Sequence, residues 1–224
     1  MNGSPDARDP PGLADTNPFA SRFVQPGAIP YAFAVQEGAD ALAEVSGKIF
    51  CAAGRRAAIV GPHGTGKSTL LADLRRRWRY EALRVTEIDA GPGRQPLNLR
   101  SDLWLCRDTD VLTIDGFERL AIWQRWQVRL LQWRLGCAVA VTLHGDLGGY
   151  ETIYRTRRTP EIEAAVLAQL LRRRPAEREA LLRSSMWAES RRRHGENLRE
   201  SLFDAYDWMR ERMTCDTPRQ PNSP

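Results

Sequence analysis

The 224-residue chain is long enough for one compact domain with a small appendage, and its 42% hydrophobic residues can build a core, which excludes a wholly disordered protein. No apolar run approaches the ~18 residues of a membrane helix, and the N-terminus has no signal-peptide pattern, so we expect a cytoplasmic protein. Arginine supplies nearly all of the basic residues behind the net charge of +5, which suits a polyanionic partner.

Both ends of the chain are poor in apolar periodicity, and residues 1–30 hold six prolines. We expect a mostly disordered arm over 1–30, without structure in at least its first 16 residues, and a disordered tail over 215–224. The aromatic and aliphatic residues of 17–33 predict that this stretch lies on the folded domain. Pro26 and Pro30 favour an extended backbone there, in reach of the glycine-rich loop described below.

Short apolar segments alternate with helical patterns through residues 31–148. Such alternation is typical of an α/β domain in which helices cover both faces of a parallel sheet. The predicted helices cover 38–50, 67–79 and 117–134, and the predicted strands cover 57–60, 83–90, 111–115 and 138–143, with an irregular stretch at GPGRQP.

The strand signals stop near residue 149, and 149–214 are predicted to form a small helical domain. Thr159 is placed to cap a first helix that carries Pro160 in its first turn. A second helix is predicted over 176–192. A third begins after Asn197, whose side chain can cap it, and one face of this helix is apolar: Leu198, Leu202, Tyr206, Met209 and Met213.

The sequence GPHGTGKST fits the P-loop pattern GxxxxGK[ST]. In such a loop, backbone N–H groups curl around phosphates, and glycine is needed where a Cβ would obstruct that path. A lysine places a compact charge on the β- and γ-phosphate oxygens, and a hydroxyl ligates Mg²⁺. The helix that leaves the loop points its N-terminus at the phosphates. The predicted nucleotide-binding residues are Gly61, Pro62, His63, Gly64, Thr65, Gly66, Lys67, Ser68 and Thr69.

An acidic residue, Asp115, ends the apolar segment VLTID further along the chain. Taken alone, this segment is typical of a buried strand that ends in an Asp-Gly turn. In a chain that also contains a P-loop, Asp115 is predicted to hold Mg²⁺ opposite Ser68. Lys67 and Glu118 are the catalytic residues predicted next to it, with Glu118 polarising the attacking water. The helix dipole alone also favours a glutamate at a helix start, so that alternative stays open for Glu118.

The predicted strand AVAVTL is followed by His144. If this strand lies between the strand of the P-loop and the strand of Asp115, its end faces the γ-phosphate, since the carboxyl ends of parallel strands share one edge. His144, or Thr142 before it, can then sense that phosphate. The alternative is that His144 is an ordinary loop residue.

GPHGTGKST is very similar to the GPPGTGKST loop of AAA+ ATPases, and the chain resembles the additional-strand class of P-loop NTPases over residues 45–214. HGENLRESLFDAYD resembles a glycine-to-arginine pattern in the lid of clamp-loader and helicase-loader AAA+ proteins. The resemblance implies that Arg199 is a catalytic lid arginine that contacts the γ-phosphate; the alternative is a surface pair with Glu196 or Asp204. The family's acid pair is stretched here to DGFE, and no arginine finger is assigned among three candidates: Arg155, Arg157 and Arg158.

Together these features predict an AAA+-like, Mg²⁺-dependent ATPase that couples ATP binding to the position of the lid and to a partner. ATP is favoured over GTP because no [NT]KxD guanine motif is present. Arginine-rich helices allow a nucleic acid or protein partner, although they also fit solvated faces; no membrane partner is expected, and an oligomer remains open. The alternatives are a small-molecule kinase, with Asp89 positioning the acceptor and the arginines of 155–158 as a lid, and a weakly hydrolysing nucleotide switch.

Four large apolar residues fall on one stripe of the helix predicted over 117–134: Trp123, Trp126, Leu130 and Trp133. A stripe at helical spacing usually packs in a core, so we predict that it covers the sheet. Stacking on nucleic acid bases is the alternative.

Overall fold

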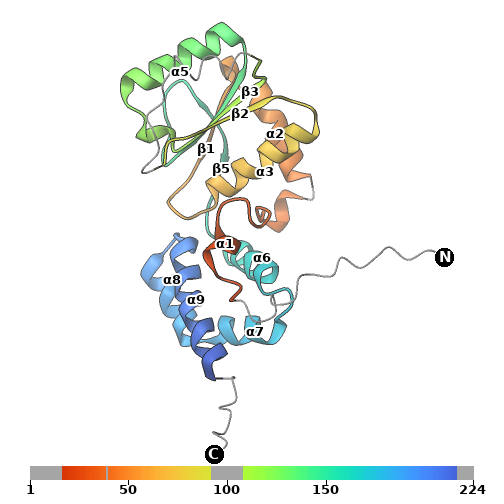
Figure 1. Ribbon diagram of the computed structural model, residues 1–224, viewed down its shortest axis with the longest axis vertical. Helices are drawn as coiled ribbons and strands as arrows, with labels where there is room; N and C mark the ends of the chain where they lie inside the picture. Colours follow the sequence, from red (N-terminus) through yellow and green to blue (C-terminus); the bar gives the residue numbers. More distant parts are fainter. Residues whose placement is uncertain (1–16, 39, 92–107, 216–224) are drawn as a thin grey trace, which may run out of the picture.

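A five-stranded sheet, parallel throughout, organises the upper half of the molecule in Figure 1. The computed structural model describes residues 17–38, 40–91 and 108–215. The strand order β2-β3-β4-β1-β5 confirms the predicted parallel α/β fold, and it places β4 between β1 and β3, as the expected role of His144 requires. The strands are β1 (Arg56–Val60), β2 (Val85–Asp89), β3 (Val111–Asp115), β4 (Ala138–Leu143) and β5 (Glu151–Arg155).

Strand β5 was not predicted, because the strand signals were expected to stop near residue 149. It lies at the edge of the sheet and pairs with β1, with Ile59 opposite Tyr154. Among its five residues only Ile153 is buried, so ETIYR lacks the continuous apolar pattern that marks the central strands. The helical part of the chain therefore begins after Arg155.

Helices cover both faces of the sheet. On one face, Ile49 of α2 and Leu74 of α3 pack with Ile59 of β1. On the other face, Val128 and Leu131 of α5 pack with Val139 of β4. Successive side chains of a strand point to opposite faces, so each strand contributes to both sides of the sheet. The helices are α2 (Ala41–Cys51), α3 (Lys67–Tyr80) and α5 (Ile122–Leu135), with short 3-10 turns η2 (Ala53–Arg55) before β1 and η3 (Phe117–Arg119) after β3.

The tryptophan stripe of α5 does not cover the sheet, so that prediction is wrong. A second stripe, Gln124, Val128 and Leu131, takes the core face instead. Sequence inspection overlooks it because it begins with a glutamine, whose side chain caps the helix by accepting a hydrogen bond from Ala121 N (2.9 Å). The first stripe is left in solvent, with these exposed fractions: Trp123 56%, Trp126 64%, Leu130 61% and Trp133 82%.

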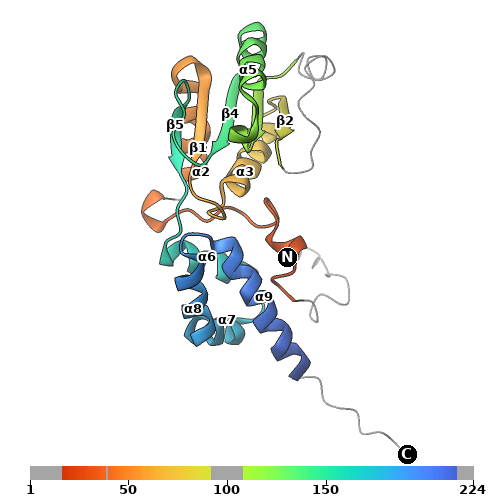
Figure 2. The same ribbon diagram turned by 90° about the vertical axis from the view of Figure 1, so that its left-hand side faces the viewer.

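Four helices after β5 pack around a separate core, to which residues of 17–33 also contribute, in the lower half of Figures 1 and 2. Thr159 and Asn197 accept N-cap hydrogen bonds at the starts of α6 and α9. The helix predicted over 176–192 is in fact two helices, because Ser184 leaves the helical conformation and its hydroxyl caps Trp187 N (3.1 Å). The bounds are α6 (Pro160–Leu170), α7 (Pro175–Arg183), α8 (Ser185–His194) and α9 (Leu198–Cys215).

Residues 17–33, here called the strap, lie between the sheet and the helical domain in Figures 1 and 2. The strap is not wholly extended as predicted, because a short helix interrupts it, α1 (Ser21–Val24), and a 3-10 turn follows it, η1 (Val35–Glu37). Phe19 is fully buried in the core of the helical domain, whereas Tyr31 packs in the core beside α2 and α3. One segment thus contributes to the core of the helical domain and to the core on one face of the sheet.

Within the described ranges, no helix is both long and apolar enough to cross a membrane. The predictions made for the first 16 residues, for most of GPGRQP and for the tail after Cys215 lie outside the described residues.

Candidate functional site

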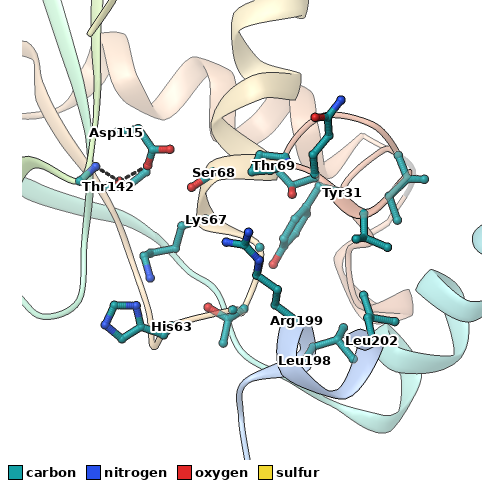
Figure 3. A pocket seen from close by; sticks show the side chains of 18 of the residues that line it. Tyr31, His63, Lys67, Ser68, Thr69, Asp115, Thr142, Leu198, Arg199 and Leu202 are labelled. Carbon is teal, nitrogen blue, oxygen red and sulfur yellow. Dashed lines mark hydrogen bonds between the residues drawn. The ribbon is translucent and has the colours of Figure 1, made fainter. Parts of the chain in front are cut away.

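The carboxyl ends of β1, β2, β3 and β4 border a cavity of about 450 Å³, seen from close by in Figure 3. The loops after the strands form one side of it, and the strap, α6 and α9 form the other. Gly61 and Pro62 are the only predicted site residues that do not line it. The others do: His63, Gly64, Thr65, Gly66, Lys67, Ser68, Thr69, Asp115, Glu118, His144 and Arg199.

The P-loop turns sharply before α3, and two of its glycines are required by their surroundings. Gly66 has φ +93°, and a Cβ there would lie 2.9 Å from the ring of Tyr31. Gly64 has φ +71°, and a Cβ there would lie 1.8 Å from Oδ1 of Asn197 at the start of α9. The left-handed backbone favours glycine at both positions, and a Cβ would also displace the side chain of Tyr31 or Asn197. The loop is therefore held between the strap and the helical domain.

Lys67 is the first residue of α3, and its side chain folds back over the P-loop. Its Nζ donates hydrogen bonds to the carbonyl oxygens of Gly61 (2.6 Å) and Pro62 (2.7 Å). Burial lowers the pKa of Lys67, and the nearby carboxylates of Glu118 and Asp115 act in the opposite direction. The ammonium is thus held inside the loop, where a phosphate oxygen can replace the two carbonyls.

Asp115 ends β3 and faces the same cavity as Ser68 (Figure 3). Thr142 Oγ1 of β4 donates to Asp115 Oδ1 (2.5 Å) and accepts from Gly116 N (2.7 Å). These bonds fix the orientation of the Asp115 carboxylate and give Thr142 a partner other than a phosphate. Thr142 is therefore better placed to position Asp115 than to sense the nucleotide.

Glu118 and His144 lie together beside Lys67. Glu118 Oε1 is 3.3 Å from His144 Nδ1, while Glu118 Oε2 is buried without a hydrogen-bond partner in the described part of the chain. The His144 ring packs on the ring of His63 from the P-loop, with 3.8 Å between centroids. Burial, with the charge of Lys67 next, lowers the pKa of His144, and Glu118 partly opposes this. A neutral His144 can share its Nδ1 proton with Glu118 Oε1.

Arg199, in the first turn of α9, points into the cavity from the helical side (Figure 3). Its guanidinium lies over the ring of Phe203, 5.7 Å from the centroid. Neither acid proposed for a surface pair binds it within the described ranges, and Asp204 instead pairs with His194 (3.0 Å). Arg199 is thus available to a ligand in the cavity.

Two of the three arginine-finger candidates are engaged within the chain. Arg155 forms a bidentate pair with Asp146, at 2.7 Å to each oxygen. The side chain of Arg158 is buried and pairs with the buried side chain of Glu163 in α6. The third candidate, Arg157, is exposed.

Two contributors to the site were not predicted from the sequence. Tyr31 N of the strap donates to Asp73 Oδ2 of α3 (2.6 Å), which holds the strap beside the P-loop helix. Thr156, directly after β5, has its hydroxyl 2.7 Å from that of Thr65 in the P-loop. The prolines and aromatic residues of 17–33 indicated that the strap lies on the domain. The position of Thr156 beside the P-loop could not be predicted, because strand β5, which places it there, was not predicted.

No protein-family model matches the chain, and a search of curated proteins found no match. Similar solved structures include the replication initiator DnaA bound to AMPPCP and single-stranded DNA, with 15% identity over 76% of this chain and 61% of that chain (TM-score 0.49). AMPPCP-bound DnaA from Aquifex aeolicus shows 14% identity over 72% of this chain and 60% of that chain (TM-score 0.46). Drosophila ORC bound to DNA shows 15% identity over 96% of this chain and 65% of that chain (TM-score 0.48).

The chain therefore spans less than two thirds of the length of each of these three structures. The fold itself follows from the order of the strands, with one strand inserted between those of the P-loop and Asp115, and from the helical domain after β5. The protein has an AAA+-like P-loop NTPase fold, as the resemblance of its P-loop implied.

Proposed function

We propose that the chain binds ATP in this cavity and hydrolyses it with Mg²⁺, coupling the nucleotide to the position of the helical domain. One observation carries the proposal: Lys67 and the pair Asp115 and Glu118, from two segments distant in the sequence, line one cavity at the carboxyl edge of a parallel sheet. This is where α/β sheets bind ligands, and the N-terminus of α3 adds backbone N–H groups for phosphate.

The two sides of the cavity suit the two ends of the nucleotide. The P-loop side is polar and supports placement of the phosphates against Lys67. The opposite side is apolar and supports placement of the purine ring between the strap and the helices, where these residues lie: Ile29, Ile162, Val166, Leu198 and Leu202. The volume of about 450 Å³ is typical of small-molecule sites, which span roughly 300 to 1,000 Å³.

Ser68 and Asp115 are the residues proposed to hold Mg²⁺. A hydroxyl and a carboxylate are the oxygen ligands that Mg²⁺ prefers, and this ion usually takes only one or two protein ligands beside water and phosphate. Bound Mg²⁺ would neutralise charge on the phosphates.

Glu118 is proposed to orient and polarise the attacking water, since it lines the cavity and its charge acts on Lys67. His144 Nδ1 lies 3.3 Å from Glu118 Oε1, and His144 directly follows β4, from where it can respond to the γ-phosphate. Glu118 and His144 thus form one unit in the proposal, with the water on one side and the P-loop on the other.

Titration of the purified full chain with ATP, ADP and GTP, followed by phosphate release with and without Mg²⁺, tests the proposal. We expect ATP to bind more tightly than GTP and Mg²⁺ to be required for phosphate release. Absence of ATP binding would overturn the proposal. Phosphate transferred in stoichiometric amount to an added metabolite would instead favour a kinase, for which Asp89 also lines the cavity, and binding without turnover would favour a switch.

Arg199→Ala is expected to reduce the preference for ATP over ADP by roughly tenfold or more, because a charge-assisted contact of ~1.5 to 3 kcal/mol to the γ-phosphate is lost. The comparison of the two dissociation constants by calorimetry measures this. Arg210→Ala, which removes an exposed arginine paired with Asp207 on the same helix, is the control and should leave the ratio unchanged. Equal loss of ATP and ADP affinity in the Arg199 variant would remove the sensor role.

A further inference from the structure

The face of α5 that points away from the sheet carries an uncovered aromatic surface, here called the α5 stripe: Ile122, Trp123, Trp126, Leu130 and Trp133. Each of these side chains is between 56% and 82% exposed. A soluble protein rarely leaves so many large apolar side chains together in water unless the surface binds a partner. Three indoles on one exposed face are therefore a functional feature to be explained.

The charge around the α5 stripe identifies the kind of partner. Helix α5 contains no acidic residue, and arginines lie along both edges of the stripe, Arg129 on one side and Arg134 on the other. The Arg129 guanidinium already lies over the Trp126 ring, 5.5 Å from its centroid. The surface thus combines flat aromatic rings with positive charge. A ligand that carries both flat rings and negative charge is complementary to it.

A second copy of α5 is not a suitable partner for the α5 stripe. The stripe residues from Trp123 to Trp133 are spaced three, four and three apart, as in a helix-pairing seam, but three of these four positions hold tryptophan. Knobs-into-holes packing uses Leu, Ile and Val at such positions. Pairing α5 with itself would also bring Arg129 and Arg134 against arginines of the other copy.

We propose that the α5 stripe binds single-stranded nucleic acid, with bases stacked on Trp123, Trp126 and Trp133 and phosphates against the flanking arginines. Base stacking on aromatic side chains is tolerant of sequence, and each stacked base contributes substantially to affinity. The 14 residues of α5 span ~21 Å at 1.5 Å per residue, enough for a few nucleotides.

The inference goes beyond the proposed ATP site and does not depend on it. None of the stripe residues lines the nucleotide cavity, and in Figure 1 α5 lies on the sheet at the end of the molecule opposite the helical domain. The two are nevertheless linked, because Arg125 of α5 donates to the backbone oxygen of Glu118 (2.6 Å). Arg125 belongs to the same helix as the α5 stripe but is not one of its residues.

The test is fluorescence anisotropy of the full chain with a fluorescein-labelled oligothymidine, at low salt. Trp126→Ala combined with Trp133→Ala is expected to weaken binding about tenfold or more, the loss expected for two stacking platforms. Tyr80→Ala, which removes a 92% exposed aromatic ring from α3, is the matched control and should bind like the wild type. The double Trp→Phe variant should recover most of the affinity, since phenylalanine still stacks.

Several results would overturn the inference: no binding by the wild type, equal affinity in the double alanine variant, or an equal loss in the Tyr80 variant. Displacement of the oligonucleotide by polyglutamate at matched charge would point to an acidic protein partner instead. A wild-type dimer that the double variant converts to a monomer, seen by light scattering, would assign the stripe to self-association. Because the stripe is exposed, unchanged melting temperatures should accompany the expected result.

Discussion

Lys67→Ala is expected to abolish ATP binding at nucleotide concentrations that saturate the wild type, with the fold intact. Lys67 supplies the only flexible ammonium in the P-loop, and two charge-assisted contacts of ~1.5 to 3 kcal/mol each correspond to a loss of about a hundredfold or more. Arginine is not expected to replace it, because a planar guanidinium does not fit so tight a loop. Calorimetric titration with ATP and Mg²⁺ measures the effect.

The melting temperature of the Lys67 variant should not fall, since burial already lowers the pKa of Lys67 and disfavours its charged form in the folded chain. The matched control is Lys48→Ala, which removes the only other lysine of the sequence. Lys48 is exposed on α2 and pairs with Glu44 (2.7 Å), so its loss should leave ATP affinity unchanged. Unaltered ATP affinity in the Lys67 variant would refute the phosphate-binding role of the loop.

Glu118→Gln is expected to keep ATP bound while phosphate release slows by about 10² to 10⁴-fold, the usual contribution of a general base. Glutamine preserves the size of the side chain and can still bond to His144, so the substitution removes mainly the negative charge that polarises water. Asp115→Asn should differ, because it weakens the ligand set of Mg²⁺ and so reduces Mg²⁺-dependent binding or turnover. Single-turnover hydrolysis beside ATP titration separates the two effects.

Glu81→Gln serves as the control for Glu118, because Glu81 is an exposed glutamate at the end of α3 that pairs only with Arg77 among the described residues (2.9 Å). It should hydrolyse ATP at the wild-type rate. If Glu118→Gln also does so, the base lies elsewhere or the protein is a switch that does not depend on catalysis.

The sequence predicted those parts of the fold that a short, contiguous pattern of residues is enough to identify. The central strands are continuous apolar runs, and β3 and β4 have the predicted bounds. The P-loop is a contiguous motif, so its residues could be named without knowing the fold. Asp115 and His144 could be placed because the carboxyl ends of neighbouring parallel strands share one edge.

The parts that were missed depend on partners distant in the sequence. An edge strand such as β5 buries one residue and resembles a loop. Helix α5 has two stripes, and the one that packs on the sheet, with Val128 and Leu131, is not the one that carries the tryptophans. The break at Ser184 interrupts a pattern that is helical on both sides, and only the cap to Trp187 reveals it.

The strap determines which fragments of this protein can fold by themselves. Phe19 packs in the core of the helical domain, and Tyr31 packs in the core beside α2 and α3. Each of these cores therefore depends on a side chain from the strap. A fragment that begins at the first residue of α2 would leave a hole in the helical core and in the core beside α2 and α3, and it would lack the strap's part of the nucleotide cavity. A fragment that folds by itself therefore has to include the strap together with the sheet and the helical domain. Cutting the chain between the sheet and the helices is not expected to give two stable halves.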